Sequence, residues 1–253
     1  MLHLGHLRDT PGRRSAGESQ TVSDWAQRFA DLAATAQDPR LRAFYACGVP
    51  AAGTLLEAVP MVALDVETTG LDPARDEIVS IGVVPMTLKC ILASAARYWV
   101  LRPRAELTPD SVAIHAITHA QIETAPDFEG VVDALLAALA GRVVVVHCRE
   151  IERRFLDLAF KSRIGEGLVF PVIDTMALEA RLHRQPPASW LARVLGRRAR
   201  PVSIRLADCR ARYTLPRYRA HHALTDALAT AELLQAQVAH HFSPQTPLAQ
   251  LLR

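Results

Sequence analysis

The pattern of apolar residues changes once along this 253-residue chain, and that change constrains the fold more than any other feature. Three strand-like runs come first, at residues 62–67, 77–86 and 90–101, and the turns between them are short. Strands joined by short turns pair antiparallel with their neighbours. After residue 128, strands alternate with helical segments, which is the pattern of parallel strands joined by crossover helices.

The alternating segments fill the second half of the chain. We expect strands at 142–147 and 169–173, and helices at 128–140, at 150–161, from 174 onward and at 222–238. The run from Val143 to Val146 is apolar at every position, as in strands that are covered on both faces. The sequence therefore predicts an α/β fold with a mixed five-stranded sheet and helices on both faces.

An N-terminal helical extension is expected before the sheet. A helix is expected after Ser23, because Trp25, Phe29 and Leu32 follow helical spacing, and Pro39 suits the first turn of a second short helix. The expected parts are a disordered N-terminus at 1–20, a helical extension and linker at 21–60, the main domain at 61–241, and a C-terminal tail at 242–253.

Composition argues against several classes of protein. The four cysteines are scattered without CxxC spacing, which argues against a zinc module or a disulfide framework and fits a reducing compartment. The N-terminus lacks the apolar stretch of a secretory signal, and charged residues interrupt the longest apolar region, so we expect no membrane span and a cytoplasmic location. No glycine-rich phosphate loop is present, which argues against a kinase or a dehydrogenase.

Asp65 and Glu67 are the first candidate functional residues. Residues two apart on a strand share a face, so both carboxylates point to one side of an otherwise apolar strand. Two such carboxylates repel one another and lose hydration, and a divalent metal ion removes this penalty. Their oxygen ligands suit magnesium or manganese. Thr68, Thr69 and Gly70 form the following turn, where a small residue lets the backbone approach a ligand.

His221 and Asp226 are the second candidate pair. Side chains five residues apart on a helix point in directions about 140° apart, so these two side chains cannot share a helical face. If Asp226 faces the sheet, His221 lies in the loop or first turn, near the mouth of a site. The helix also has a small-residue face suited to pack on the acidic strand, formed by Ala223, Ala227 and Ala231. An ordinary helix start with an incidental acid is the alternative.

Glu152 is the third candidate. A strand that ends at His147 leads directly into a helix, and Glu152 falls near the first turn of that helix, within reach of a metal at the strand ends. Asp157 is its rival, and since it lies five positions further on, the two acids cannot both face inward. The alternative is a surface acid that the helix dipole stabilises.

A strongly basic segment precedes the last helix. From Arg181 to Arg219 there are eleven arginines and one acid, a net charge of +10 that leaves −7 for the rest of the chain. Such a segment suits a phosphate backbone, and a solvated loop is the alternative. The candidates are Arg193, Arg197, Arg198, Arg200, Arg217 and Arg219 for phosphates, and Trp190, Tyr213 and Tyr218 for stacking on a base.

Taken together, the three motifs resemble those of the DEDDh exonucleases, and in particular the epsilon-subunit-like proofreading exonucleases of bacterial DNA polymerase III. The segments are Asp-x-Glu-Thr-Thr-Gly from Asp65, the strand-to-helix acid segment from His147, and His-x-Ala-x-x-Asp from His221. The resemblance covers roughly residues 60–240, in the family's order and at its approximate spacing. The sequence around His115 resembles a family segment near the nucleotide pocket, and Asp174 resembles the strand–helix junction before the third motif.

The resemblance implies a ribonuclease-H-like fold and a two-metal hydrolysis with two Mg²⁺ or Mn²⁺ ions. By this analogy, Asp65 bridges both ions, Glu67 and Asp226 hold the ion that activates water, and Glu152 supports the second ion. His221 is the implied general base. Phosphodiester hydrolysis needs a nucleophile at neutral pH and charge neutralisation on the leaving oxygen, which such a pair of ions supplies.

The resemblance also implies a substrate and a partner. The implied substrate is a single-stranded or frayed 3′ end of DNA, the implied partner is a DNA polymerase subunit, and the implied process is proofreading or repair. The expected substrate contacts are Thr68, Thr69, Gly70, His115 and His147.

Two positions depart from the family's pattern. The second motif usually has Asn after its His and Asp at the acid position, where this chain has Cys148 and Glu152. Glu has the same charge as Asp, but its carboxylate lies one methylene farther from the backbone. This indicates a divergent branch of the family that keeps the metal ligand with an altered geometry. The missing Asn affects substrate contacts near His147 and leaves the reaction class unchanged.

Two other functions stay open at this point. One is an RNA-trimming exonuclease of the same superfamily, because the metal site contacts only the phosphate. The other is a non-catalytic accessory module that binds nucleic acid or a polymerase. The complete acid set and His221 argue against the second alternative.

Overall fold

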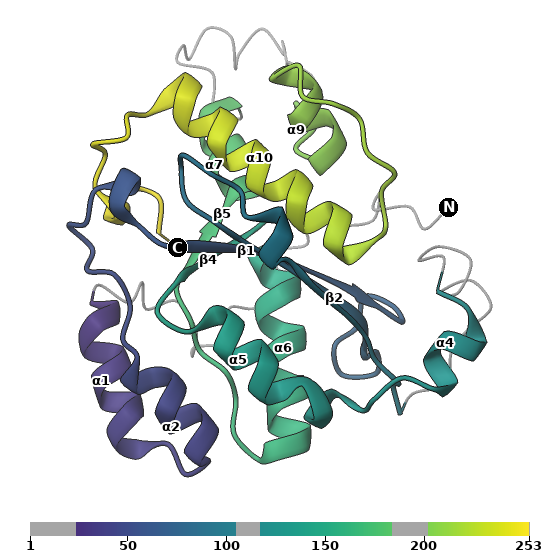
Figure 1. The fold of residues 1–253 in the computed structure, drawn as a ribbon. Helices are drawn as coiled ribbons and strands as arrows, with labels where there is room; N and C mark the ends of the chain where they lie inside the picture. The colour runs from purple at the N-terminus through teal and green to yellow at the C-terminus, as the bar shows by residue number, and fades with distance from the viewer. Residues whose placement is uncertain (1–23, 105–116, 184–201, 253) are drawn as a thin grey trace, which may run out of the picture.

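The computed structural model describes residues 24–104, 117–183 and 202–252 (Figure 1). Its centre is a five-stranded sheet of order β3-β2-β1-β4-β5. β1 pairs antiparallel with β2, and β2 pairs antiparallel with β3, whereas β1, β4 and β5 run parallel. The predicted mixed sheet is thus confirmed. The strands are β1 Met61–Thr68, β2 Ile78–Met86, β3 Arg97–Val100, β4 Val143–Val146 and β5 Val172–Asp174.

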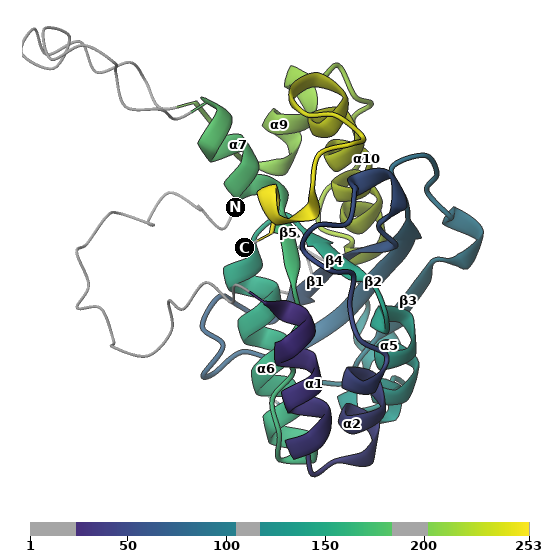
Figure 2. The same ribbon diagram turned by 90° about the vertical axis from the view of Figure 1, so that its left-hand side faces the viewer.

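Helices cover both faces of the sheet, as Figures 1 and 2 show. On one face lie α7 Thr175–His183, α9 Leu206–Arg212 and α10 Ala223–His241. On the other lie α5 Val132–Leu139 and α6 Arg149–Ile164. Each face has its own buried apolar cluster, and alternate residues of β1 enter the two clusters. Because Met61 and Ala63 face α10, Asp65 and Glu67 face α10 as well.

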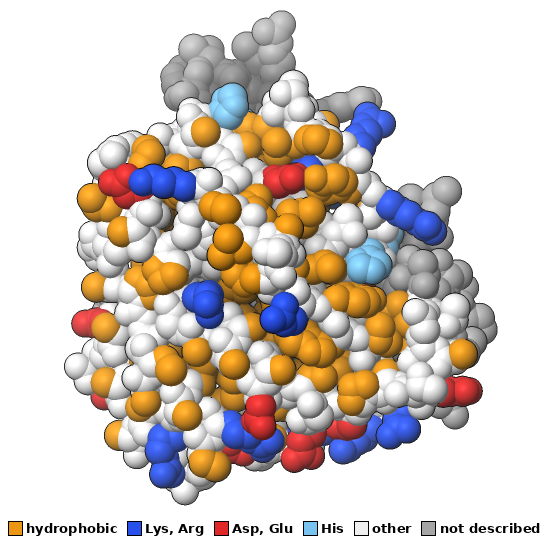
Figure 3. Space-filling view, viewed as in Figure 1, with side chains coloured by type: hydrophobic (Ala, Val, Ile, Leu, Met, Phe, Trp, Pro, Cys, Tyr) orange, Lys and Arg blue, Asp and Glu red, His pale blue; other side chains and the backbone are white. Residues whose placement is uncertain are grey.

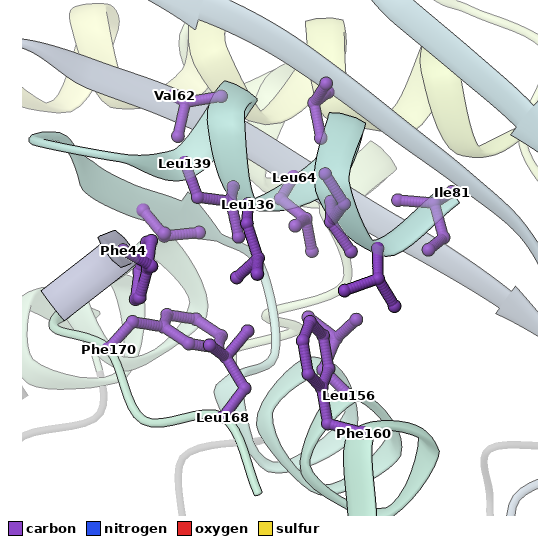
Figure 4. Packing of buried hydrophobic residues seen from close by; sticks show 14 of the residues in the cluster. Phe44, Val62, Leu64, Ile81, Leu136, Leu139, Leu156, Phe160, Leu168 and Phe170 are labelled. Atoms are coloured by element: carbon purple, nitrogen blue, oxygen red, sulfur yellow. The ribbon is translucent and has the colours of Figure 1, made fainter. Parts of the chain in front are cut away.

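Two N-terminal helices share the core on the α6 face. They are α1 Trp25–Thr35, whose first turn Asp24 caps, and α2 Pro39–Ala46, which has Asp38 as its cap and Pro39 in its first turn. Figure 4 shows Phe44 of α2 packed beside Leu139 and Phe170. The residues 24–46 therefore build part of the domain's own core.

Polar contacts fix these helices to the loop after α6. Glu166 accepts hydrogen bonds from the backbone N–H groups of Gln37 and Asp38, at 2.9 and 2.8 Å. The backbone N–H of Val169 donates to the Tyr45 hydroxyl at 3.0 Å. A packed apolar face together with satisfied backbone groups makes this an integral contact.

The C-terminal residues also pack on the domain. The short 3₁₀ helix η5 Leu248–Gln250 buries Leu248 completely, and Leu251 is buried beside it. The backbone of Leu248 donates to the carbonyl oxygen of Thr54 at 2.9 Å, which joins the end of the chain to the linker before β1. A further 3₁₀ helix in that linker is η2 Leu56–Ala58.

The structure differs from the predicted elements in several details, among them the start of β5 at Val172, three residues later than expected. Only Arg97–Val100 of the third run is a strand, because the residues before it form a turn and the 3₁₀ helix η3 Ala93–Ala95. The first crossover helix opens as 3₁₀ helix η4 Phe128–Val131 before α5. The basic segment contains α9, which the sequence analysis did not predict. The expected disorder at 1–20 lies outside the described residues.

A short helix, α4 His119–Glu123, lies near the end of the sheet. Thr118 and Gln121 form a capping box at its start, and Ile122 packs on Val79 of β2. None of the helices in the described ranges is long and apolar enough to cross a membrane.

Candidate active site

The acidic strand β1 brings two carboxylates to the face of the sheet under α10. Asp65 is partly buried and Glu67 is only 7% exposed. They lie two residues apart and therefore share this face, as the sequence predicted.

Gly82 lets the beginning of α10 approach these acids. It is the β2 partner of Asp65, and a Cβ atom on it would overlap the backbone of Ala223 and Leu224. The predicted alanine face of α10 is confirmed, because Ala223, Ala227 and Ala231 are fully buried against the sheet. The absence of a side chain at Gly82, which the sequence analysis did not single out, allows the close contact between helix and strand.

This close contact brings Asp226 to the two acids of β1. One carboxylate oxygen from each of Asp65, Glu67 and Asp226 lies within 4.8 Å of the others. Asp226 lies more than 150 residues along the chain from the two acids of β1, and the three form a group of the size that a single cation needs.

Burial and neighbouring charges raise the pKa of Asp65 and of Asp226. Burial, followed by the charges of Glu67, Glu152 and Asp226, raises the pKa of Asp65 well above its usual value. Burial is also the main cause of the raised pKa of Asp226, where the Glu67 charge adds to it. A cation between these groups would offset the repulsion, so the donor set and its electrostatics fit a divalent metal ion.

Glu152 points inward from α6, and its rival Asp157 does not. Glu152 is 3% exposed, and its Oε2 atom is buried with no hydrogen-bond partner among the described residues. Asp157 instead forms an ion pair of 2.6 Å with Lys161. Glu152 is outside the 4.8 Å group, but its charge contributes to the raised pKa of Asp65.

Burial raises the pKa of Glu152 well above its usual value, and the charge of Asp174 adds to this effect. Asp174 lies at the end of β5, where it accepts from the backbone N–H groups of Ala177 at 3.0 Å and Arg149 at 3.4 Å. Asp174 thus holds the beginnings of α6 and α7 together behind Glu152.

His221 lies in the loop immediately before α10, as predicted. It is exposed, and its backbone N–H donates to Asp226 Oδ2 at 2.8 Å. Its φ of +69° is in the left-handed region, which costs a non-glycine residue about 1–2 kcal/mol. The backbone at His221 is therefore held in place by its surroundings and tied to one of the acids.

The turn after β1 is closed by its own contacts. The Thr68 hydroxyl donates to the carbonyl oxygen of Gly70 at 2.5 Å, and the Thr69 hydroxyl donates to Asp76 at 3.0 Å. A Cβ atom on Gly70 would overlap the Asp76 carboxylate. A larger residue here would displace the Asp76 side chain that closes the turn.

His147, an expected substrate contact, is 7% exposed. Its Nδ1 atom lies 2.8 Å from the Thr175 hydroxyl, and its Nε2 atom lies 3.0 Å from the carbonyl oxygen of Ile204. Burial lowers the pKa of His147 to about 4. These contacts link the end of β4 to α7 and to the segment before α9. His115 lies outside the described residues.

The basic segment divides into buried and exposed arginines. Arg210 is 4% exposed and forms a 2.6 Å ion pair with Glu232. Arg212 donates from Nε to Glu179 at 3.0 Å, and Glu179 is fully buried. The predicted stacking of Tyr213 on a base is wrong, because Tyr213 is buried and donates its hydroxyl to Glu179 at 2.7 Å.

The exposed arginines follow the loop into α10. They include Arg217 and Arg219, and Arg205 is exposed at the start of α9. Figure 3 shows Lys and Arg side chains along this loop and an exposed histidine where α10 begins. The remaining predicted phosphate contacts and one stacking candidate lie outside the described residues: Arg193, Arg197, Arg198, Arg200 and Trp190.

Comparison with known proteins identifies the family. Residues 62–234 match the family model of the RNase_T exonucleases, so this chain belongs to that exonuclease family. It is 29% identical over 185 residues to the DNA polymerase III subunit epsilon of Treponema pallidum, covering 73% of this chain and 79% of the relative. It is 31% identical over 177 residues to the PolC-type DNA polymerase III of Thermotoga petrophila, covering 70% of this chain but only 12% of that protein.

A solved structure shows the same fold. The nuclease domain of 3′hExo, a DEDDh family member bound to rAMP, matches with a TM-score of 0.59 and 16% identity, covering 72% of this chain and 92% of that one. The predicted ribonuclease-H-like fold and the predicted exonuclease class are thus confirmed. The exonuclease family is divalent-metal dependent, and the acidic cluster of this chain is suited to such an ion.

Proposed function

We propose that this chain removes nucleotides one at a time from the 3′ end of DNA, with two divalent cations, Mg²⁺ or Mn²⁺, held by its acids. The observation that carries the proposal is the convergence of Asp65, Glu67 and Asp226 within 4.8 Å in a chain of the exonuclease family. Three adjacent carboxylates on an apolar sheet face destabilise the fold unless a cation offsets their charge, which favours a metal-binding role for them.

The four acids have separate roles in this proposal. Asp65, Glu67 and Asp226 hold one cation, and Asp65 and Glu152 hold the second. The Oε2 atom of Glu152 supports this assignment. It is buried and has no hydrogen-bond partner among the described residues, and such an oxygen requires a compensating group. When bound, the cations supply a nucleophile at neutral pH and neutralise the leaving oxygen.

His221 is the proposed general base. It is exposed at the edge of the acidic cluster, where its ring can accept the proton of the attacking water. The bond from its backbone to Asp226 keeps the imidazole near the cation that Asp226 holds. A general base at such a position contributes about 10²–10⁴-fold to the rate.

DNA is the proposed substrate because the relatives are named as parts of DNA polymerase III. The exposed Arg205, Arg217 and Arg219 are the proposed phosphate contacts, and the turn Thr68–Gly70 and His115 remain proposed contacts to the terminal nucleotide. The proposed contact from His147 would require one of its two ring nitrogens to leave its present partner in the protein. A DNA polymerase in the cytoplasm is the proposed partner.

A labelled-oligonucleotide assay tests the proposal. With 5′-labelled single-stranded DNA and Mg²⁺ or Mn²⁺, we expect a ladder that shortens by single nucleotides from the 3′ end, and 3′-labelled DNA should release mononucleotide at once. EDTA and Asp65→Ala should abolish both signals. Full activity of Glu152→Ala beside an inactive Asp157→Ala would show that Glu152 is not the metal ligand.

RNA is the second candidate substrate, because the 3′hExo nuclease domain was solved with rAMP and the metal site contacts only phosphate. Matched DNA and RNA oligonucleotides in the same assay distinguish the two. A third possibility, a non-catalytic accessory module, predicts binding of DNA without metal-stimulated hydrolysis.

A further inference from the structure

The loop before α10, residues 214–222, is fixed at its beginning by Arg210 and at its end by Tyr98, besides the bond from His221 to Asp226. We call it the His221 loop. Two of its residues, Thr214 at φ +56° and His221 at φ +69°, have left-handed backbone that non-glycine residues rarely adopt. Such strain persists only where surrounding contacts impose the conformation, and it gathers at functional sites.

Arg210 anchors the beginning of the loop. From α9, its guanidinium donates to the carbonyl oxygen of Pro216 at 2.9 Å and to that of Ala229 in α10 at 2.7 Å. It also pairs with Glu232 at 2.6 Å. The ring of Tyr218 lies 4.6 Å from the guanidinium carbon of Arg210, and the Tyr218 hydroxyl donates to Glu232 at 2.8 Å. These bonds tie the loop to the helix that carries Asp226.

Tyr98 anchors the end of the loop. Its ring stacks on His222, with centroids 4.6 Å apart and planes 21° apart. Tyr98 pairs with Gly82 in the sheet, and Gly82 pairs with Asp65, so the three residues form one row across the strands. The stack therefore ties the residue after His221 to the same row of the sheet that carries Asp65.

We propose that Tyr98 and Arg210 are positioning residues that hold His221 in place from the two ends of its loop. This inference rests on the proposed function, since neither residue is assigned any chemistry of its own. Arg210 is buried and bonded to the backbone of α10, and Tyr98 contacts the His221 loop through its stack on His222. The two anchors explain how an exposed base can keep a fixed distance from the cation ligands.

The expected effect of losing an anchor is on turnover. Tyr98→Leu removes the stacked ring, and we expect kcat to fall by about 10–100-fold, because a displacement near 1 Å of a catalytic group has this effect. The KM for DNA and the affinity for Mn²⁺, measured by titration calorimetry, should change by less than about twofold. Tyr98→Phe keeps the ring and should retain wild-type turnover. Tyr218→Leu tests the other end without truncating the buried Arg210.

Arg217→Gln is the contrasting variant on the same loop, because Arg217 is a proposed phosphate contact and its loss should raise the KM for DNA. Arg28→Gln is the control, because Arg28 is exposed on α1 outside the site, and it should leave both kcat and KM unchanged. A rise in KM without a fall in kcat for Tyr98→Leu would instead make Tyr98 a substrate contact and would overturn the inference.

A double-mutant cycle separates positioning from general stability. If Tyr98 acts through His221, the double variant Tyr98→Leu/His221→Ala should be no slower than His221→Ala alone. Additive losses would overturn the inference while leaving the proposed function intact. Full activity of His221→Ala, or no metal-dependent hydrolysis by the wild-type protein, would instead overturn the proposed function.

Hydrogen exchange gives a readout that needs no activity. The amides of the His221 loop should exchange faster in Tyr98→Leu than in the wild-type protein, whereas those of β1 and β4 should be unchanged. Equal exchange of the loop in both proteins would show that Tyr98 does not hold it.

Discussion

Gly82→Ala is the sharpest test of how the acidic cluster is assembled. Gly82 stands beside Asp65 in the sheet, and an added Cβ would overlap the backbone of Ala223 and Leu224. The backbone of a buried helix cannot rotate aside as the end of a side chain can. The substitution must therefore lift the first turn of α10, three residues before Asp226, or distort β2.

The structure sets the size of the expected effect. Inserting one methyl group into a packed core costs about 1–3 kcal/mol. For a domain of this size each kcal/mol lowers Tm by about 2–4 °C, so we expect a loss of about 2–12 °C. A shift of about 1 Å at Asp226 would lower the exonuclease rate by about 100-fold. Because Asp226 then no longer shares a cation with Asp65, the protein should also lose the stabilisation that Mn²⁺ gives.

Thermal unfolding with and without Mn²⁺, together with the oligonucleotide assay, measures all three quantities. Gly53→Ala is the control, because a Cβ at that position meets nothing within 4 Å. It should change stability by less than about 0.5 kcal/mol. A Gly82→Ala protein with unchanged Tm, full stabilisation by Mn²⁺ and wild-type activity would refute this account of the site.

Three further predictions concern charge and the core. Because the pKa of Asp65 is raised, the metal-free protein loses stability as pH rises above about 4. Asp65→Asn removes this charge, so it should raise the Tm of the metal-free protein at pH 8 by about 2–4 °C while abolishing hydrolysis. Because the pKa of His147 is lowered to about 4, the neutral ring contributes up to about 3 kcal/mol to stability, and this is lost as pH falls from about 6.5 toward 4. In urea unfolding, the stability of His147→Asn should therefore change less with pH than that of the wild-type protein. Deleting residues 1–48 removes Phe29, Leu41 and Phe44 from the core, and the burial of each such side chain contributes about 1.5–3 kcal/mol. The summed loss is a large part of a domain's stability, so circular dichroism should show an unfolded or aggregated protein. A folded deletion protein with wild-type Tm would contradict the last prediction.

Local periodicity made the central part of the site predictable from sequence. A strand repeats every two residues, so Asp65 and Glu67 had to share a face, and the helical repeat placed Asp226 and His221 in different positions around the start of α10. The sheet order followed from the change in pattern along the chain. Each of these steps depends on neighbours in sequence, and each agrees with the structure.

The contacts that complete the site depend on residues far apart in the chain. Nothing in the sequence around Gly82 indicates that α10 begins directly above it, because that contact joins positions 141 residues apart. Helix geometry predicted that only one of Glu152 and Asp157 could face inward. The packing of α6 on the sheet shows that it is Glu152. The strand predicted at residues 90–101 is shorter in the structure, because β3 extends only where β2 lies beside it and that pairing also depends on the tertiary fold.

The basic segment shows why charge counted along a sequence differs from charge available to a substrate. Arg210 and Arg212 belong to the +10 segment, yet in the fold they are paired with Glu232 and Glu179, which come from outside it. A guanidinium paired with a carboxylate attracts a phosphate backbone far less than an exposed, unpaired one does. These two arginines therefore shape the segment, because they fix α9 and the His221 loop to α7 and α10. Attraction for nucleic acid is left to exposed neighbours such as Arg217, so neutralising Arg217 should lower the salt dependence of DNA binding, whereas neutralising Arg212 should first lower stability.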